Sequence, residues 1–340
     1  MLRRRSFLLL PALGLLPYRR MQSGLVMPPS LPPVNRLAFG GDVMMCRYVG
    51  ERARALADPG APMRDIAPFF SSADIAFVNL EAPFSDRGRP IHQGMVFKVE
   101  PEMVEALRIA GIGIVSTANN HARDCGSYGV SFTLDWLARN GIAAVGSGET
   151  AEAAHNGVVL ERNGVKFGFL AYTYDQSNGN FHDRDDRIAT MDIHVMAADV
   201  ARMLERADVA IVSMHAGIEY WSRPNQQQRE FAHAAIDAGA QLVVGHHPHV
   251  VEPAESYRHG VIFYSLGNLV FDQFQRKDTQ HGLVADVIFV GKRLAHWKLL
   301  PVDIVRAAPR LASTTDENGV SPIGGRNVRS VSGGSLASAR

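Results

Sequence analysis

The sequence of 340 residues predicts an α/β fold with two sheets or one large mixed sheet. Short apolar runs alternate with amphipathic helical patterns over most of the chain, which is typical of α/β proteins. The dipeptide Asn163-Gly164 separates two apolar runs, and this arrangement is a strong signal for a two-residue β-hairpin. Candidate site residues come from both halves of the chain, so we expect one domain rather than two.

The elements are expected in order from residue 36. The predicted strands are residues 37–39, 74–80, 113–118, 158–162, 165–170, 209–214, 242–244, 261–265, 283–290 and 294–304. The predicted helices are a stretch ending near residue 57 and residues 101–110, 129–140, 192–206 and 225–238. Pro101 suits a first helical turn, and Gly141 suits a helix stop. Residues 176–191 are polar and rich in Asp, which indicates an exposed loop.

The N-terminus is predicted to be an export signal rather than part of the fold. Arginines at positions 3–5 precede an apolar stretch that ends near residue 16, as in a secretory signal. Arg4, Arg5, Phe7 and Leu8 are arranged as in a twin-arginine signal, with an ordinary secretory signal or an uncleaved anchor as alternatives. The apolar run is shorter than the roughly 20 residues that span a bilayer, and no later segment is a candidate span.

Four segments follow from these patterns. We assign residues 1–23 to the export signal or anchor, 24–34 to a linker, 35–308 to the folded domain and 309–340 to a disordered tail. The tail contains few large apolar residues, so it cannot bury a core of its own. The two cysteines, Cys46 and Cys125, are either a disulfide of an exported protein or two buried thiols.

The charge of the chain is balanced. Lys and Arg number 35 against 34 Asp and Glu, so we expect no nucleic-acid partner, which would require a basic surplus. The balanced charge does not exclude an anionic substrate, because bound metal ions bring their own positive charge.

Polar side chains follow the apolar runs at several predicted strand ends. The sequence Gly-His-His-Pro-His at residues 245–249 places three imidazoles directly after one such run. Asp42, Glu81, Asn120 and His215 stand at the ends of other runs. Ligand sites of α/β sheets gather at the carboxyl ends of strands, and a mixed set of oxygen and nitrogen ligands favours Mn, Fe or Zn. Two such ions would activate attack on a phosphoryl or acyl centre, and Glu81 is the best candidate for a bridging carboxylate.

Six ordered motifs between about residues 36 and 290 resemble those of CapA-type capsule (poly-γ-glutamate) biosynthesis proteins. They are Gly-Asp-Val-Met at 41–44, Asn-Leu-Glu at 79–81, Ala-Asn-Asn-His-Ala at 118–122, Ser-Met-His-Ala-Gly-Ile-Glu-Tyr at 213–220, His-His-Pro-His-Val at 246–250 and Tyr-Ser-Leu-Gly-Asn-Leu-Val-Phe-Asp at 264–272. That family belongs to the calcineurin-like metallophosphoesterase superfamily. The resemblance therefore implies a four-layer α/β fold, in which helices flank a two-sheet β-sandwich.

The resemblance also implies a role for each matching residue. Asp42 and His249 would hold a first divalent ion, and Glu81 would bridge it to a second. The ligands of the second ion would be Asn120, His215 and His247. His121 would protonate the leaving group or steady the transition state without binding metal. The residues expected to support the ligands or face the substrate are Arg123, Asp124, Glu219, Tyr220, Asn268 and Asp272.

The chain departs from the general metallophosphoesterase pattern at three positions. Met44 stands where the first motif usually has a His, so the first ion would lack one nitrogen ligand. Glu81 stands where the bridging residue is usually an Asp, and Ala216 stands where a Trp is usual. The first two departures are typical of the CapA branch. His246, although part of the conspicuous cluster, is expected to lie outside the ligand set.

The function expected from these features is metal-dependent hydrolysis or transfer on a phosphoester or γ-glutamyl polymer during capsule or cell-envelope synthesis. The expected partners are an anionic polymer and components of a membrane polymer synthase, in the periplasm or cell envelope. One alternative is a non-catalytic, polymer-binding accessory of a synthase or exporter, which would have no need for His121. Another is an exported nuclease or phosphodiesterase, which the balanced charge disfavours.

Overall fold

The computed structural model describes residues 31–87, 95–174 and 186–312. The chain divides after Pro32, and every element below belongs to the unit that begins at Pro33. The predicted export signal, most of the predicted linker and tail, and most of the expected loop at 176–191 lie outside the described residues.

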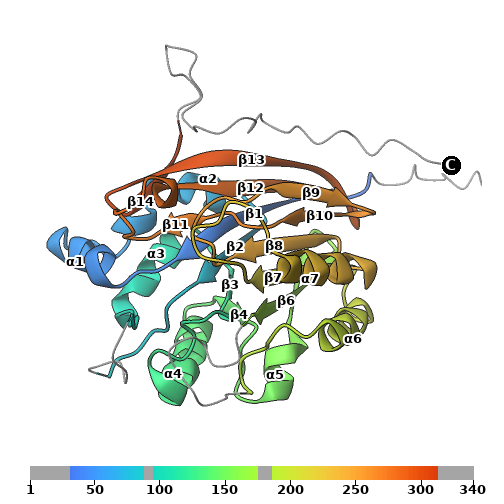
Figure 1. Cartoon of the computed structure of the whole chain (residues 1–340), viewed down its shortest axis with the longest axis horizontal. Helices are drawn as coiled ribbons and strands as arrows, with labels where there is room; N and C mark the ends of the chain where they lie inside the picture. Colours follow the sequence, from blue (N-terminus) through green and yellow to red (C-terminus); the bar gives the residue numbers. More distant parts are fainter. Residues whose placement is uncertain (1–30, 88–94, 175–185, 313–340) are drawn as a thin grey trace, which may run out of the picture. The chain divides into compact units, whose positions relative to one another are not determined.

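Among the described residues, the first sheet has eight strands with β1 near its middle (Figure 1). Its strands are β1 (Val34–Val43), β2 (Ile75–Leu80), β3 (Ile114–Ser116), β4 (Ala143–Val145), β11 (Asn268–Val270), β12 (His281–Val290), β13 (Arg293–Val305) and β14 (Ala308–Leu311). β1 to β4 pair in parallel, so their carboxyl ends lie at one edge. β12 pairs antiparallel with β1 on the other side and continues into β13 and β14.

In the part of the chain that the structure describes, the second sheet has six strands in the order β5-β6-β7-β8-β10-β9. They are β5 (Val158–Arg162), β6 (Val165–Thr173), β7 (Val209–His215), β8 (Leu242–His246), β9 (Ala254–Tyr257) and β10 (Gly260–Phe263). β6, β7, β8 and β10 are parallel. The predicted hairpin joins β5 to β6, with φ of 48° at Asn163 and 75° at Gly164, as a two-residue turn of this kind requires.

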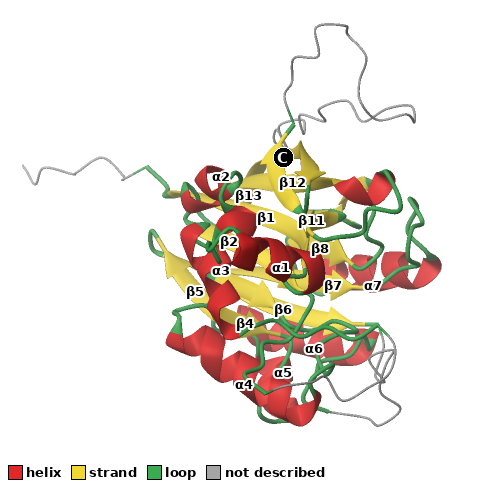
Figure 2. Ribbon diagram, turned by 90° about the vertical axis from the view of Figure 1, so that its left-hand side faces the viewer, coloured by secondary structure: helices red, strands yellow, loops and turns green. Residues whose placement is uncertain are grey.

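Two layers of helices enclose the two sheets (Figure 2). The helices are α1 (Arg47–Ala55), η1 (Ala61–Met63), α2 (Ala67–Ser71), η2 (Pro101–Met103), α3 (Val104–Ile109), α4 (Gly126–Arg139), α5 (Ala151–Asn156), α6 (Ile193–Leu204), α7 (Gln226–Asp237) and η3 (Asp278–Gln280). Alternation along β1 shows the layering, because Leu37 and Phe39 pack between the sheets while Ala38 packs on the side of α1 to α3. In β7, Ile211 faces the space between the sheets and Val212 faces the core with α5 to α7.

The four-layer α/β architecture predicted from the sequence is confirmed. At the end of the domain, β14 continues to Leu311, three residues beyond the boundary expected at residue 308. These residues are ordered because they pair with the long strand β13. β4, β9, β11, α2 and α5 were not predicted, because they are too short for a hydrophobic period to be recognised.

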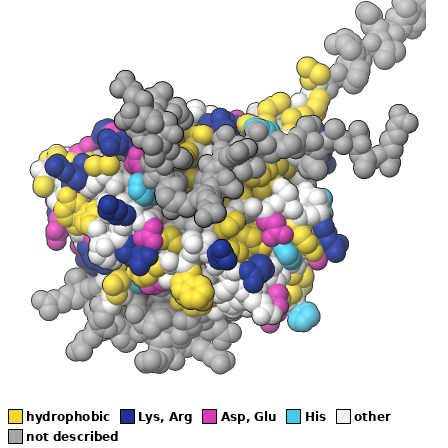
Figure 3. Space-filling model, turned by 45° about the horizontal axis from the view of Figure 1, so that its top comes forward, with side chains coloured by type: hydrophobic (Ala, Val, Ile, Leu, Met, Phe, Trp, Pro, Cys, Tyr) yellow, Lys and Arg dark blue, Asp and Glu magenta, His cyan; other side chains and the backbone are white. Residues whose placement is uncertain are grey.

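Basic and acidic side chains are interspersed on the face shown in Figure 3. This distribution agrees with the formal net charge of +1. No helix in the described residues is both long and apolar enough to cross a membrane.

Candidate metal centre

The carboxyl ends of parallel strands from both sheets meet at one place and carry the predicted ligands. Asp42 lies in β1, and Glu81 follows β2 directly. His215 is the last residue of β7, and the loop after β8 supplies the His-Pro-His segment. The predicted ligands and His121 are all buried, namely Asp42, Glu81, Asn120, His121, His215, His247 and His249.

A first group of potential ligands consists of Asp42, Glu81 and His249, each with one ligand atom within 4.8 Å of the others. Nδ1 of His249 lies 3.5 Å from Oδ2 of Asp42, and its Nε2 lies 3.7 Å from Oε1 of Glu81. Asn268 fixes the tautomer of this imidazole. Its amide nitrogen donates to Gln273, so its Oδ1, 3.0 Å from Nδ1 of His249, is an acceptor. The proton therefore lies on Nδ1, and the lone pair of Nε2 is directed to the metal position.

A second group consists of Glu81, His215 and His247, again within 4.8 Å of one another. Nε2 of His215 and Oδ1 of Asn120 form a hydrogen bond of 2.8 Å, and Oε1 of Glu81 lies 3.9 Å from the same nitrogen. Two atoms that bind one ion at about 2.1 Å and at right angles lie about 3 Å apart, so the first distance suits a shared ion. Glu81 belongs to both groups and therefore lies within reach of both candidate metal positions.

The electrostatics of the centre also fit a cation. Burial and the neighbouring charge of Asp42 raise the pKa of Glu81 well above its ordinary value. Burial alone would raise the pKa of Asp42 too, but the hydrogen bond with His249 and the charge of His246 hold it below its usual range. Within the described residues, Oε1 of Glu81 is buried without a hydrogen-bond partner. A cation would remove the repulsion between the carboxylates and satisfy this oxygen.

His215 is suited to metal binding by its protonation state. Burial and the neighbouring imidazole of His247 lower its pKa well below the ordinary value for His. The ring is therefore neutral at physiological pH and keeps a lone pair for a ligand bond.

The local backbone is adapted to bring these groups together. His247 and His249 have φ of 99° and 60°, in the left-handed region that costs free energy for residues other than glycine. The backbone N–H of His247 donates to Oδ2 of Asp42 at 3.2 Å, which connects this strained loop to β1. A Cβ atom at Gly41 would lie 1.8 Å from the carbonyl oxygen of Gly267, so only glycine lets β11 pair with β1 beside Asp42.

His121 forms a buried pair with Asp124. Nδ1 of His121 lies 2.6 Å from Oδ2 of Asp124, which also accepts the backbone N–H of Phe97 at 2.7 Å. The Phe97 ring stacks on the imidazole with centroids 4.0 Å apart. These contacts fix the orientation of the ring directly after Asn120.

Asn79 is a site residue that the sequence analysis did not select. Its side-chain nitrogen donates to Oδ1 of Asp42 at 2.8 Å and lies 3.5 Å from Oε2 of Glu81 and 3.2 Å from Nδ1 of His215. Its Oδ1 accepts from the side chain of Asn119 at 3.3 Å. In the sequence, Asn79 could have been selected because it stands two residues before Glu81, and residues at this spacing share one face of a strand.

The remaining residues of the predicted site lie around the ligands. Tyr220 is 6.2 Å from His249 between ring centroids and accepts a hydrogen bond from Gln273. Glu219 is exposed, and its charge contributes to the raised pKa of Glu81 after burial and Asp42. Arg123 is buried two residues after His121.

Two further predicted residues are placed as follows. Asp272 forms an ion pair with Arg47, which is not one of the predicted ligands. His246 has its Nδ1 3.6 Å from Oδ1 of Asp42 but belongs to neither ligand group of the described residues.

Both cysteines are buried free thiols. Sγ of Cys46 donates to Sδ of Met44 at 3.0 Å, and Sγ of Cys125 donates to the carbonyl of Phe97. Burial raises the pKa of each thiol to about 12. The structure therefore has the two-thiol arrangement rather than the disulfide.

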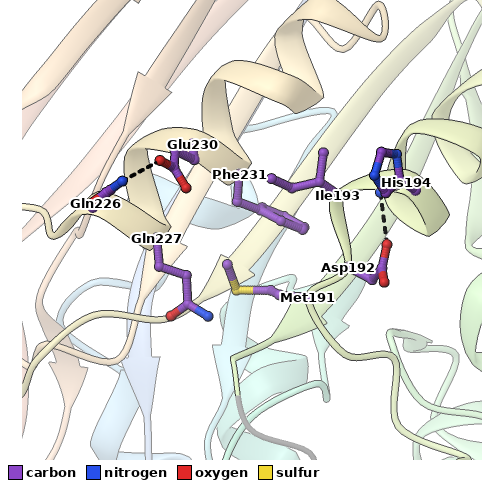
Figure 4. Close-up of a pocket in the computed structure, with 8 residues that line it drawn as sticks. All are labelled: Met191, Asp192, Ile193, His194, Gln226, Gln227, Glu230 and Phe231. Atoms are coloured by element: carbon purple, nitrogen blue, oxygen red, sulfur yellow. Dashed lines mark hydrogen bonds between the residues drawn. The ribbon is translucent and has the colours of Figure 1, made fainter.

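A separate pocket of about 570 Å³ opens between the first turns of α6 and α7 (Figure 4). Asp192 caps α6, and Glu230 accepts a hydrogen bond from Gln226 on α7. These carboxylates make the pocket a poor match for an anionic substrate.

The comparisons with known proteins show the family of this chain. The model of the family described as bacterial capsule synthesis protein PGA_cap matches residues 36–273. The chain belongs to this family. The PGA biosynthesis protein CapA of Bacillus subtilis is 31% identical to this PGA_cap protein over 316 residues, which cover 89% of the chain and 81% of CapA. A probable polyglutamine synthesis accessory protein of Mycobacterium tuberculosis is 28% identical over 292 residues, covering 71% of the chain and 75% of that protein.

A hypothetical protein from Thermus thermophilus has a similar fold. Its crystal structure aligns with a TM-score of 0.50 and 18% sequence identity. The alignment covers 79% of the PGA_cap chain and 99% of the Thermus chain. This likeness concerns the fold alone.

Proposed function

We propose that this PGA_cap protein is an exported enzyme that uses two divalent ions, Mn, Fe or Zn, to hydrolyse or transfer a bond of an anionic polymer. The observations that carry the proposal are the position of Glu81 in two ligand groups and the buried His121–Asp124 pair, which directly follows Asn120 in the chain. Shared carboxylates of this kind hold two metals in hydrolytic sites. The named relatives support a polymer context, because their names refer to PGA biosynthesis and to polyglutamine synthesis.

The protein's own groups would orient the substrate and move the proton. The metal ions would supply Lewis-acid polarisation of a phosphoryl or carbonyl oxygen. His121 would donate a proton to the leaving group, since Asp124 holds its Nδ1 and leaves Nε2 as the transferring atom. Stacking on Phe97 keeps the imidazole in this orientation without a conformational search.

A non-catalytic accessory role is the second candidate. The name of the Mycobacterium tuberculosis relative favours it, since that protein is called an accessory protein. The two roles differ in what they require of His121, because a polymer-binding accessory has no use for a buried His–Asp pair beside the metals.

The deciding experiment measures metal content and activity on the full-length protein. Wild type, Glu81→Gln and His121→Gln are loaded with Mn²⁺ and assayed on bis-p-nitrophenyl phosphate and on poly-γ-glutamate. We expect Glu81→Gln to lose metal, and His121→Gln to keep metal but lose about 10²-fold in rate. The exposed His296→Gln serves as the control and should match wild type.

Each other result has a defined meaning. A wild-type protein without bound metal would remove every version of the centre. Metal binding with equal background rates in wild type, His121→Gln and His296→Gln would leave the accessory role. Activity on only one substrate would identify the bond that is attacked.

We also propose that the chain is exported by the twin-arginine route, which carries proteins already folded. The arrangement of Arg4, Arg5, Phe7 and Leu8 supports this proposal. Replacing Arg4 and Arg5 by Lys should retain the protein in the cytoplasm, as measured by cell fractionation. Unchanged export of the double variant would instead indicate an ordinary secretory signal.

A further inference from the structure

Arg47, the first residue of α1, has an unusual backbone and an unusual environment. Its φ is 51°, in the left-handed region that a side chain of this size rarely adopts. Its guanidinium lies 4.9 Å from the centre of the Phe97 ring and 6.0 Å from that of Phe271. Such backbone strain persists only where the surroundings enforce it, and it is concentrated at functional sites.

The two rings connect Arg47 to the metal centre. Phe97 stacks on His121 with centroids 4.0 Å apart, and the edge-to-face pair of Phe271 and His249 has centroids 4.7 Å apart. Phe97 and Phe271 are themselves 6.0 Å apart and almost fully buried. We call these two rings the aromatic shelf. Arg47 and two histidines of the centre therefore contact the same two rings.

Asp272 fixes the guanidinium and leaves one edge of it available. Nε of Arg47 donates to Oδ2 of Asp272 at 3.2 Å, and Nη2 donates to Oδ1. The same carboxylate accepts the backbone N–H of Tyr48. Among the described residues, Nη1 makes no recorded hydrogen bond, and the side chain is 36% exposed. The donors of a fixed, planar guanidinium suit the oxygens of a carboxylate or phosphate.

We propose that Arg47 binds an anionic group of the substrate, a carboxylate or a phosphate, next to the bond held at the metal ions. This inference rests on the proposed function for the nature of the substrate. A γ-linked glutamyl chain carries one free carboxylate on every residue, and a phosphodiester chain carries one phosphate on every repeat. In either polymer, a group adjacent to the reacting bond would meet Arg47 across the aromatic shelf.

The test measures equilibrium binding rather than turnover. Fluorescently labelled poly-γ-glutamate or tripolyphosphate is titrated with full-length protein at low salt, both Mn²⁺-loaded and metal-stripped. We expect Arg47→Gln to weaken binding about tenfold in both forms, because a charged hydrogen bond is lost. The affinity of Arg47→Lys should lie between those of wild type and Arg47→Gln, since Lys keeps the charge but lacks the planar donor edge.

Arg258→Gln is the matched control. Arg258 also lies over an aromatic ring, that of Tyr257 at 5.5 Å, and its Nε pairs with Asp237 at 2.9 Å. It precedes β10, at the opposite edge of the sheet from the metal centre. We expect this variant to bind either polymer within about twofold of wild type.

The outcomes separate this inference from its alternatives. Equal weakening in Arg47→Gln and Arg258→Gln, or no weakening in either, overturns it. If Arg47→Gln unfolds, Arg47→Lys decides, because weaker binding at an unchanged melting temperature supports the site and unchanged binding overturns it. An effect with only one polymer identifies the bound group as carboxylate or phosphate. A protein without catalytic activity that still shows Arg47-dependent binding refutes the proposed hydrolase and not this site.

Discussion

Asn79 donates a 2.8 Å side-chain hydrogen bond to Oδ1 of Asp42. The same amide lies against His215, which belongs to the other ligand group. One neutral side chain from β2 thus orients ligands that come from β1 in the first sheet and β7 in the second. The spacing of the two ligand groups depends on this contact as well as on Glu81, which belongs to both groups.

Removing Asn79 should therefore weaken metal binding without removing any ligand. We expect Asn79→Ala to lower the affinity for Mn²⁺ about 10- to 100-fold, the usual effect of losing a group that orients metal ligands. The measurement is a competition titration with a chromophoric chelator. Asn35→Ala is the control. Asn35 is buried like Asn79, but it lies at the amino end of β1. If both variants keep wild-type affinity, Asn79 does not orient the ligands.

His246 and His249 should respond differently to substitution, although both are buried beside Asp42. Only His249 belongs to a ligand group in the described residues. We expect His249→Ala to lose at least one equivalent of metal and His246→Ala to retain wild-type stoichiometry. Metal content after dialysis, measured by mass spectrometry, checks this. Equal losses in the two variants would place His246 among the ligands.

Asp124→Asn should reduce turnover while leaving the metal ions in place. The carboxylate lies 2.6 Å from Nδ1 of His121 and accepts its hydrogen bond with a full negative charge, which an amide lacks. We expect kcat to fall by about 10²-fold with little change in KM. A loss of bound metal would show that Asp124 acts on the fold instead. A change in KM alone would show that it acts on substrate binding.

The sequence was sufficient to predict an α/β fold with two sheets or one large mixed sheet from its apolar patterns, and the resemblance to CapA-type proteins implied the four layers. It was also sufficient to select the groups of the candidate centre, because carboxylates and imidazoles at strand ends gather at one edge. It was not sufficient for Asn79 or Arg47. Their roles depend on contacts with residues more than a hundred positions away, His215 and Asp272, and neither residue type is by itself diagnostic.

The aromatic shelf could not be predicted for a related reason. Phe97 and Phe271 are 174 positions apart, and each appears in the sequence as an ordinary apolar core residue. Only the fold brings His121 against Phe97 and His249 against Phe271, and these contacts connect the two rings to the candidate centre.

Glu252 should make the stability of the protein depend on pH. It is 2% exposed, and burial raises its pKa to about 7, although the side chain of Gln228 donates to its Oε2 at 2.7 Å. Because the pKa in the folded state is above the unfolded value near 4.3, the neutral carboxyl stabilises the fold. Its contribution is complete below that unfolded value and is lost as the pH rises through about 7.

The variant Glu252→Gln removes this titration while keeping a side chain of the same shape for Gln228. We expect wild type to lose about 2 kcal/mol of unfolding free energy between about pH 5 and about pH 8 relative to this variant. Urea denaturation at the two pH values measures the difference. The exposed Glu161→Gln controls for the general effect of removing one charge and should follow wild type. Parallel pH dependence in wild type and Glu252→Gln would show that the buried carboxyl does not titrate in this range.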